Sequence, residues 1–119
     1  MATLTNIITP VVKPSAAPAN NTITAAGDQF AAEYGAVYLL RFNNGSATPA
    51  NVVMDDPNSA TPADATAFNP DVTVAVPAGE ARSMRVDASR FRNSSGNIVW
   101  TYSADMTNAA SKVEIYRVA

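Results

Sequence analysis

The sequence contains no cysteine and no histidine, and each absence excludes a class of chemistry. Without cysteine the chain has no disulfide bond, no thiol nucleophile and no thiolate ligand for zinc or an iron–sulfur cluster. Without histidine it has no Ser-His-Asp triad, no histidine metal ligand and no imidazole general base. Only a carboxylate pair, a lysine-activated serine or an oxygen-ligated metal ion remains open. We therefore expect a protein that is not an enzyme and that binds no cofactor.

Charge is also scarce. Charged residues make up 15% of the 119 residues, against about 25% in typical soluble domains. The net charge of −2 argues against a nucleic-acid partner. Alanine, threonine, asparagine and serine total 54 residues, so small neutral side chains must cover much of the surface. Such a surface loses little side-chain entropy and ion hydration when a protein covers it, which suits a subunit of a large assembly; an alanine-rich genome bias explains the composition equally well.

Long apolar runs are missing too. No stretch approaches the ~20 apolar residues of a membrane span. No positive charge precedes Lys13, so we expect neither a signal peptide nor a membrane protein. Leucine occurs only 3 times, whereas valine and isoleucine total 17. Because β-branched side chains pack well on a pleated surface, this ratio favours strands in a single domain.

Residues 1–35 differ from the rest of the chain. Pro10, Pro14 and Pro18 exclude a helix here and favour an extended arm. An arm with apolar anchors and no core of its own should lie against its own sheet or against a neighbouring subunit; the alternative is a disordered leader. The predicted anchors are Leu4, Ile7, Ile8, Val11 and Val12.

Residues 36–119 alternate between apolar strands and turns. Ala36–Phe42 is apolar on both faces, which is typical of a central strand. Asn44-Gly45 follows and predicts a hairpin with Asn51–Asp55 as the partner strand. Four further strands follow a long loop at residues 56–70. They are predicted at Asp71–Val76, Ala81–Val86, Ile98–Ser103 and Ser111–Val118, with a turn at Pro77–Glu80 and one helical turn at Ala88–Phe91.

Six strands joined by short turns predict an all-β fold. We expect an antiparallel β-sandwich or jelly-roll-like domain at residues 36–119, with the extended proline-containing arm at residues 1–35. Two packed layers are preferred because a single sheet would leave one apolar face of the strand at Ala36–Phe42 uncovered.

Four arginines form the densest charge cluster, and we predict that they bind a partner. Because arginine grips carboxylates bidentately, they would suit an acidic surface; local pairing with Glu80 and Asp87 is the alternative. The cluster comprises Arg82, Arg85, Arg90 and Arg92.

Other candidate sites have simpler explanations. The loop between Asp55 and Asp71 is rich in oxygen ligands but lacks the spacing of a calcium loop, so turn formation explains it as well. Trp100 and Tyr102 could stack on a sugar, yet at alternating strand positions they fit a core better. Asn44-Gly45-Ser46 has the pattern of a glycosylation acceptor and is interpreted as a turn.

The order of these segments resembles the small β-sandwich decoration (cement) proteins of tailed-phage capsids. The resemblance covers roughly residues 36–118 and rests on Tyr38–Gly45, Val72–Glu80, Arg90–Phe91, Gly96–Ser103 and Val113–Ile115. It implies a structural virion protein made in the host cytoplasm, which binds the major capsid protein on the capsid exterior and stabilises the shell by bridging capsomers. It also implies self-association on the capsid as a dimer or trimer, and no catalytic motif.

Two alternatives remain. A head–tail connector would have the same composition, and its copy number would distinguish it. A β-sandwich module of a tail or fibre that binds a glycan or receptor would use Trp100, Tyr102 and the loop between Asp55 and Asp71.

Overall fold

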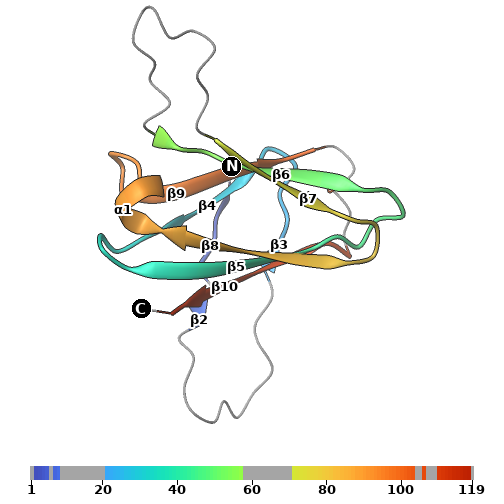
Figure 1. The fold of residues 1–119 in the computed structure, drawn as a ribbon, viewed down its shortest axis with the longest axis horizontal. Coiled ribbons are helices and arrows are strands. Elements are labelled where there is room, and N and C mark those ends of the chain that lie inside the picture. The colour runs from blue at the N-terminus through green and yellow to red at the C-terminus, as the bar shows by residue number, and fades with distance from the viewer. Residues whose placement is uncertain are drawn as a thin grey trace, which may run out of the picture.

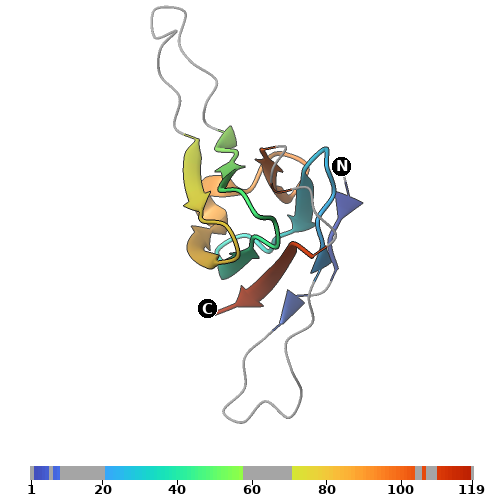
Figure 2. The ribbon, with the colours of Figure 1, turned by 90° about the vertical axis from the view of Figure 1, so that its right-hand side faces the viewer.

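The computed structural model describes residues 2–5, 7–8, 21–57, 71–103, 106 and 110–118. They form two packed β-sheets and one short helix, α1 (Ala88–Phe91), which confirms the predicted β-sandwich (Figure 1). Seen along the strands, the two layers enclose a common core (Figure 2).

Sheet I has the strand order β1-β4-β9-β6-β7. Its central strand β9 pairs antiparallel with both β4 and β6, and β7 pairs antiparallel with β6 at one edge. The short strand β1 pairs parallel with β4 at the other edge. The bounds are β1 (Ala2–Thr3), β4 (Asp28–Ala31), β6 (Ala50–Met54), β7 (Val72–Val76) and β9 (Asn97–Tyr102).

Sheet II has the order β2-β10-β5-β8, and the short strand β3 also pairs with β10. The predicted central strand is confirmed, since β5 lies between β10 and β8 and is antiparallel to both. Strand β2 pairs parallel with β10. The bounds are β2 (Ile7–Ile8), β3 (Asn21–Thr22), β5 (Val37–Asn43), β8 (Ala81–Asp87) and β10 (Lys112–Arg117).

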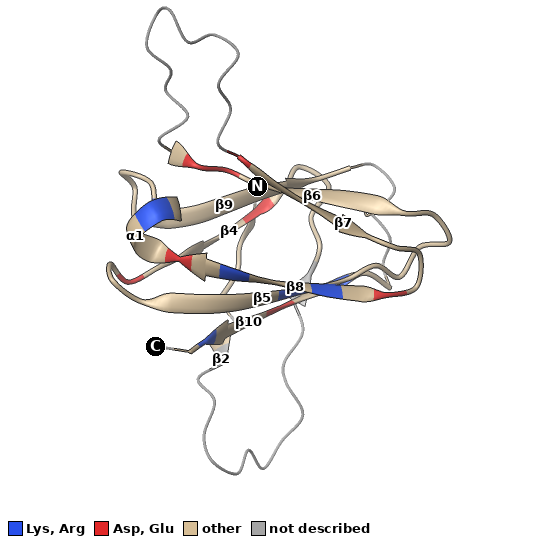
Figure 3. Cartoon of the chain, in the orientation of Figure 1, with Lys and Arg blue, Asp and Glu red and all other residues tan. Residues whose placement is uncertain are grey.

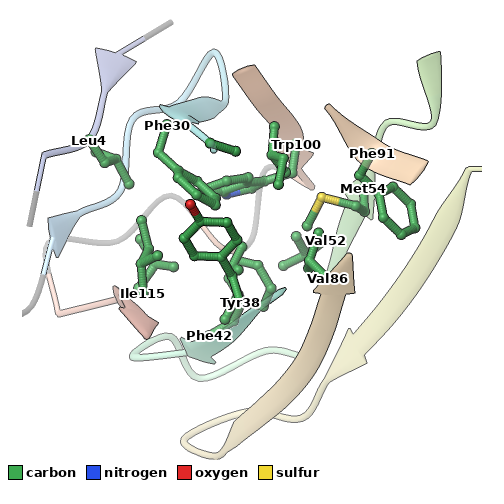
Figure 4. Packing of buried hydrophobic residues seen from close by; sticks show 14 of the residues in the cluster. Leu4, Phe30, Tyr38, Phe42, Val52, Met54, Val86, Phe91, Trp100 and Ile115 are labelled. Atoms are coloured by element: carbon green, nitrogen blue, oxygen red, sulfur yellow. The ribbon is translucent and has the colours of Figure 1, made fainter. Parts of the chain in front are cut away.

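An aromatic cluster joins the two sheets (Figure 4). Trp100 is fully buried, and its ring centroid lies 5.9 Å from that of Phe30 in sheet I and 5.8 Å from that of Phe42 in sheet II. Phe30 in turn meets Tyr38 edge to face at 4.8 Å. Because strand side chains alternate, these inward residues determine which of their neighbours point outward.

The N-terminal segment contributes to this core, which changes the predicted division of the chain. The sandwich begins before residue 36, because β4 belongs to sheet I and Phe30 is fully buried. The side chain of Leu4 belongs to the core, and the residue is only 9% exposed. Its N–H donates to the Gln29 carbonyl at 2.7 Å. Ile7 packs against the same core. The arm was expected to lie against its own sheet or against a neighbouring subunit, and Leu4 and Ile7 lie against the core of their own molecule.

The rest of the predicted arm is described only in part. The backbone of Ile8 pairs with Tyr116 in β10. Val11 and Val12, together with the three prolines of the arm, lie outside the described residues.

The hairpin predicted at Asn44-Gly45 is wrong, because β5 and β6 lie in different sheets. A type I′ turn needs positive φ at both central residues, and none of the described non-glycine residues has one. Asn44 is instead fully buried, at the point where the chain passes from sheet II to sheet I, and its hydrogen bonds stabilise this passage. Its side-chain amide donates to the carbonyls of Thr48 and Val76, and its Oδ1 accepts from Ser46.

Gly45 is required by a close approach of two segments. A Cβ at this position would lie 2.5 Å from the backbone of Ala110, just before β10. The Gly45 N–H also donates to Ser111 Oγ at 2.9 Å. The Asn-Gly pair therefore marks a crossing between sheets rather than a hairpin.

The turn and the helical turn predicted downstream are confirmed. The Glu80 N–H donates to the Pro77 carbonyl at 3.1 Å, and φ of +69° at Gly79 gives a type II turn that joins β7 to β8. Asp87 caps α1 by accepting from the Ser89 N–H at 3.1 Å. The hydrogen bond from the Ser89 hydroxyl, and next the one from the Ser89 N–H, lower the pKa of Asp87.

We expect Leu4→Ala to lower the free energy of unfolding by about 2–4 kcal/mol, because it removes buried methyl groups from the core. Thr3→Ala, at the neighbouring exposed position, is the matched control and should cost less than about 1 kcal/mol. Urea unfolding followed by the fluorescence of Trp100 measures both. Equal losses in the two variants would contradict the intramolecular role of Leu4.

Candidate functional site

The arginines predicted to form one interface are separated by the fold. Arg82 pairs in register with the inward-facing Phe42, and Arg85 with Leu39, so the two arginines lie on opposite faces of β8. Both are exposed. Arg82 donates to the Ala81 carbonyl at 2.8 Å and lies 3.8 Å from Glu80, as the local-pairing alternative expected.

Arg90 and Arg92 hold the fold together. Arg90 Nε donates to the buried Asp56 carboxylate at 2.9 Å, and its guanidinium carbon lies 4.6 Å from the Phe91 ring centroid. Arg92 Nε donates to the Ala32 carbonyl at 2.8 Å. Asp56 follows β6 and Ala32 follows β4, so both contacts tie α1 and Arg92 to sheet I. The four arginines therefore do not form one basic patch.

The outward face of sheet II is charged and contains an ion pair within the molecule. Arg41 of β5 donates to Glu114 of β10 at 2.9 Å, and Tyr116 donates to the other oxygen of the same carboxylate. Burial, and next the Glu114 carboxylate, raise the pKa of Tyr116 to about 12. Arg85 and Lys112 lie on this face as well, by their register with Leu39 and Asn43.

The outward face of sheet I carries no charged strand residue among those described, and we call it the neutral face. In Figure 3, β9, β6 and β7 are free of charge, whereas charged segments lie along β8, β5 and β10. The charged segment on β4 is Asp28, which is fully buried. By their register, the residues of the neutral face are Thr3, Gln29, Ala31, Asn51, Val53, Thr73, Ala75, Asn97, Val99 and Thr101.

Carboxylates appear at one corner of the neutral face. Asp55 follows β6 and Asp71 precedes β7, and the Asp56 N–H donates to Asp71 Oδ1 at 2.8 Å. Burial, then the charges of Asp71 and Asp56, raise the pKa of Asp55. The described residues contain no group of three carboxylates that could hold a metal ion. Most of the predicted oxygen-rich loop, residues 58–70, lies outside the described residues.

Trp100 lies in the core and Tyr102 packs against it, as the alternating pattern favoured, so the alternative of a sugar-stacking surface is excluded. Trp100 is fully buried, and its indole N–H donates to the Tyr102 hydroxyl at 2.7 Å. That hydroxyl donates to Asp28 Oδ2 at 2.6 Å, and the Thr24 N–H donates to the same oxygen at 3.2 Å. The chain of hydrogen bonds satisfies the polar atoms that the aromatic residues bring into the core.

The sequence indicated the arginines but not the neutral face. The absence of charged residues from one face can be recognised only when the strands have been assigned to sheets. The signal in the sequence was the alternation of small neutral residues with apolar ones, as in Val72–Val76.

The chain matches no model of a known protein family, no curated protein and no solved structure. Among the described residues, no helix has the length and apolar character needed to cross a membrane. What the protein does is therefore inferred from its residues and their arrangement.

The Tyr102 hydroxyl should make stability fall at alkaline pH. Burial, and next the hydrogen bond to Asp28, raise the pKa of Tyr102 above its ordinary value. Above pH about 10 the unfolded chain loses this proton while the folded chain keeps it. The contribution of the protonated Tyr102 to stability is therefore complete below pH about 10. Above this pH the free energy of unfolding falls by up to about 1.4 kcal/mol per pH unit.

Tyr102→Phe isolates this contribution. We expect the variant to be about 1–3 kcal/mol less stable at neutral pH, because Asp28 and Trp100 lose their shared partner. Its further loss above pH about 10 should be shallower than that of the unmodified chain. Tyr34→Phe is the control, since Tyr34 is 74% exposed. Parallel alkaline losses in all three proteins, measured by urea unfolding, would be inconsistent with a buried Tyr102 proton.

Proposed function

We propose that the protein is a structural subunit of a phage virion that binds the outer surface of the capsid and bridges neighbouring capsomers. Its partner would be the major capsid protein, which it would bind on the capsid exterior. The observation that supports this best is the neutral face of sheet I, opposite a charged face with an internal ion pair on sheet II. The resemblance to decoration proteins supplies the identity of the partner.

A neutral face suits permanent burial. Covering a charged side chain without a partner costs several kcal/mol, whereas Thr101, Val53 or Thr73 loses little hydration or rotamer freedom. The arginine and glutamate of sheet II already satisfy each other, so that face can remain in water. The neutral face would therefore contact the shell.

The size of the face indicates how such a protein would work. Five strands about 4.8 Å apart, each about five residues long at roughly 3.3 Å per residue, cover at most roughly 400 Å². A stable interface usually buries about 800 Å² on each partner. One copy would therefore bind modestly by this face alone, and stabilisation of the shell would come from many copies that each resist the separation of capsomers.

The alternatives differ in how well the residues support them. A head–tail connector would use the same neutral face, and copy number separates the two: hundreds of copies per virion indicate decoration, and about six or twelve indicate a ring. A glycan-binding module loses the aromatic part of its proposed surface, because Trp100 is buried.

Thr101→Lys tests the neutral face. The lysine would lie in the middle of the proposed contact, next to Val53, and we expect at least a roughly tenfold loss of affinity for heads that lack the protein. Ser83→Lys, on the outward face of β8, is the matched control and should bind normally. Co-sedimentation with heads measures occupancy, and circular dichroism verifies folding. Undiminished binding by folded Thr101→Lys would overturn the assignment of this face.

A further inference from the structure

Strand β7 forms an edge that lacks the usual protection against pairing with another chain. It pairs with β6, and no other described strand lies beside it in sheet I. Its sequence, Val72-Thr73-Val74-Ala75-Val76, has high β-propensity and contains no charge, proline or glycine. Exposed edges normally carry charged residues, proline or a bulge, because their free N–H and C=O groups bind other strands.

The other sheet edges are protected or short. Strand β8, at the edge of sheet II, carries Arg82, Arg85 and Asp87. Strands β1 and β2, at the opposite edges, are each 2 residues long. Strand β7 lies on the same side of the molecule as β8, to which the turn at Pro77–Glu80 connects it (Figure 2). Among the described strands, β7 is therefore the best suited to pair with a second chain.

We propose that β7 pairs antiparallel with β7 of a second copy of this chain, about a two-fold axis at Val74. Thr73 then lies opposite Ala75 of the second copy, and Val72 lies opposite Val76. The contact is self-complementary, as a two-fold interface requires. No charge lies opposite a like charge, because Asp71 at the start of β7 faces Pro77 of the second copy.

This pairing has two structural consequences. It joins the neutral faces of two copies into one continuous face of at most roughly 800 Å², which equals one side of a standard interface. The β8 strands of the two copies also run in opposite directions about the two-fold axis. The two Arg82 side chains therefore lie at opposite ends of the dimer. The first consequence deepens the proposed function, whereas the dimer itself forms without a shell.

Sedimentation of the full chain across a dilution series tests the dimer. The double variant Thr73→Lys/Ala75→Lys puts four lysines next to one another across the proposed contact. We expect the dissociation constant to rise at least about tenfold. Thr3→Lys/Ala31→Lys is the matched control, because it adds the same charges at exposed positions near the opposite edge of sheet I. It should remain dimeric. An unmodified chain that is monomeric throughout, or a folded double variant that dimerises normally, overturns the proposal.

Single cysteines test the register with a much milder change, and the chain has no cysteine of its own. A mixture of Thr73→Cys and Ala75→Cys should form a disulfide-linked heterodimer under mild oxidation, because directly opposite residues come close enough. Each variant alone places its two cysteines on a diagonal, about 7–8 Å between opposite strands, and should cross-link far less. Equal cross-linking in all three samples, or none in the mixture, contradicts the register.

The two proposals can fail separately. Dimerisation is measured without any capsid, so a dimer that does not bind heads contradicts the proposed function alone. A monomer that binds heads through the neutral face contradicts only the β7 pairing.

Discussion

The packing of Trp100 between Phe30 and Phe42 determines the rest of the structure, because it joins the two sheets and sets the alternation of their strands. With Trp100 inward, Val99 and Thr101 must point outward; with Phe42 inward, Arg41 and Asn43 must do so. A shift of one residue in either strand would bury an arginine or expose a tryptophan. The core therefore determines the chemistry of both surfaces.

The two outward faces consequently differ in what they can contact. On sheet II the outward face is charged, Arg41 and Glu114 form an ion pair within the molecule, and water can cover these charges. On sheet I the side chains are small and neutral, and burial against another protein removes little hydration. A low charge content alone could reflect only a biased genome, but its unequal distribution between two faces of one sandwich is a property of the fold. The proposed assembly role rests on this asymmetry.

Sequence patterns predicted the elements that depend on local alternation, and missed those that depend on distant partners. The strand predicted at Ser111–Val118 is confirmed as β10, and its Val113 and Ile115 are fully buried. The crossing at Asn44-Gly45 was interpreted as a hairpin, because its requirement is the approach of Ala110, far along the chain. Strand β4 was missed because it is 4 residues long and begins with Asp28, whose partner is Tyr102. Arg90 was likewise assigned to an interface because its contact with Asp56 bridges segments that are far apart in sequence.

The most direct test of the central claim is an electron cryo-microscopy reconstruction of the intact particle in which the sandwich can be fitted. The account predicts that the strands β9, β6 and β7 lie against the shell and that the face bearing Arg41 and Glu114 points to solvent. The opposite orientation, with the charged face on the shell and the neutral face bare, would contradict it.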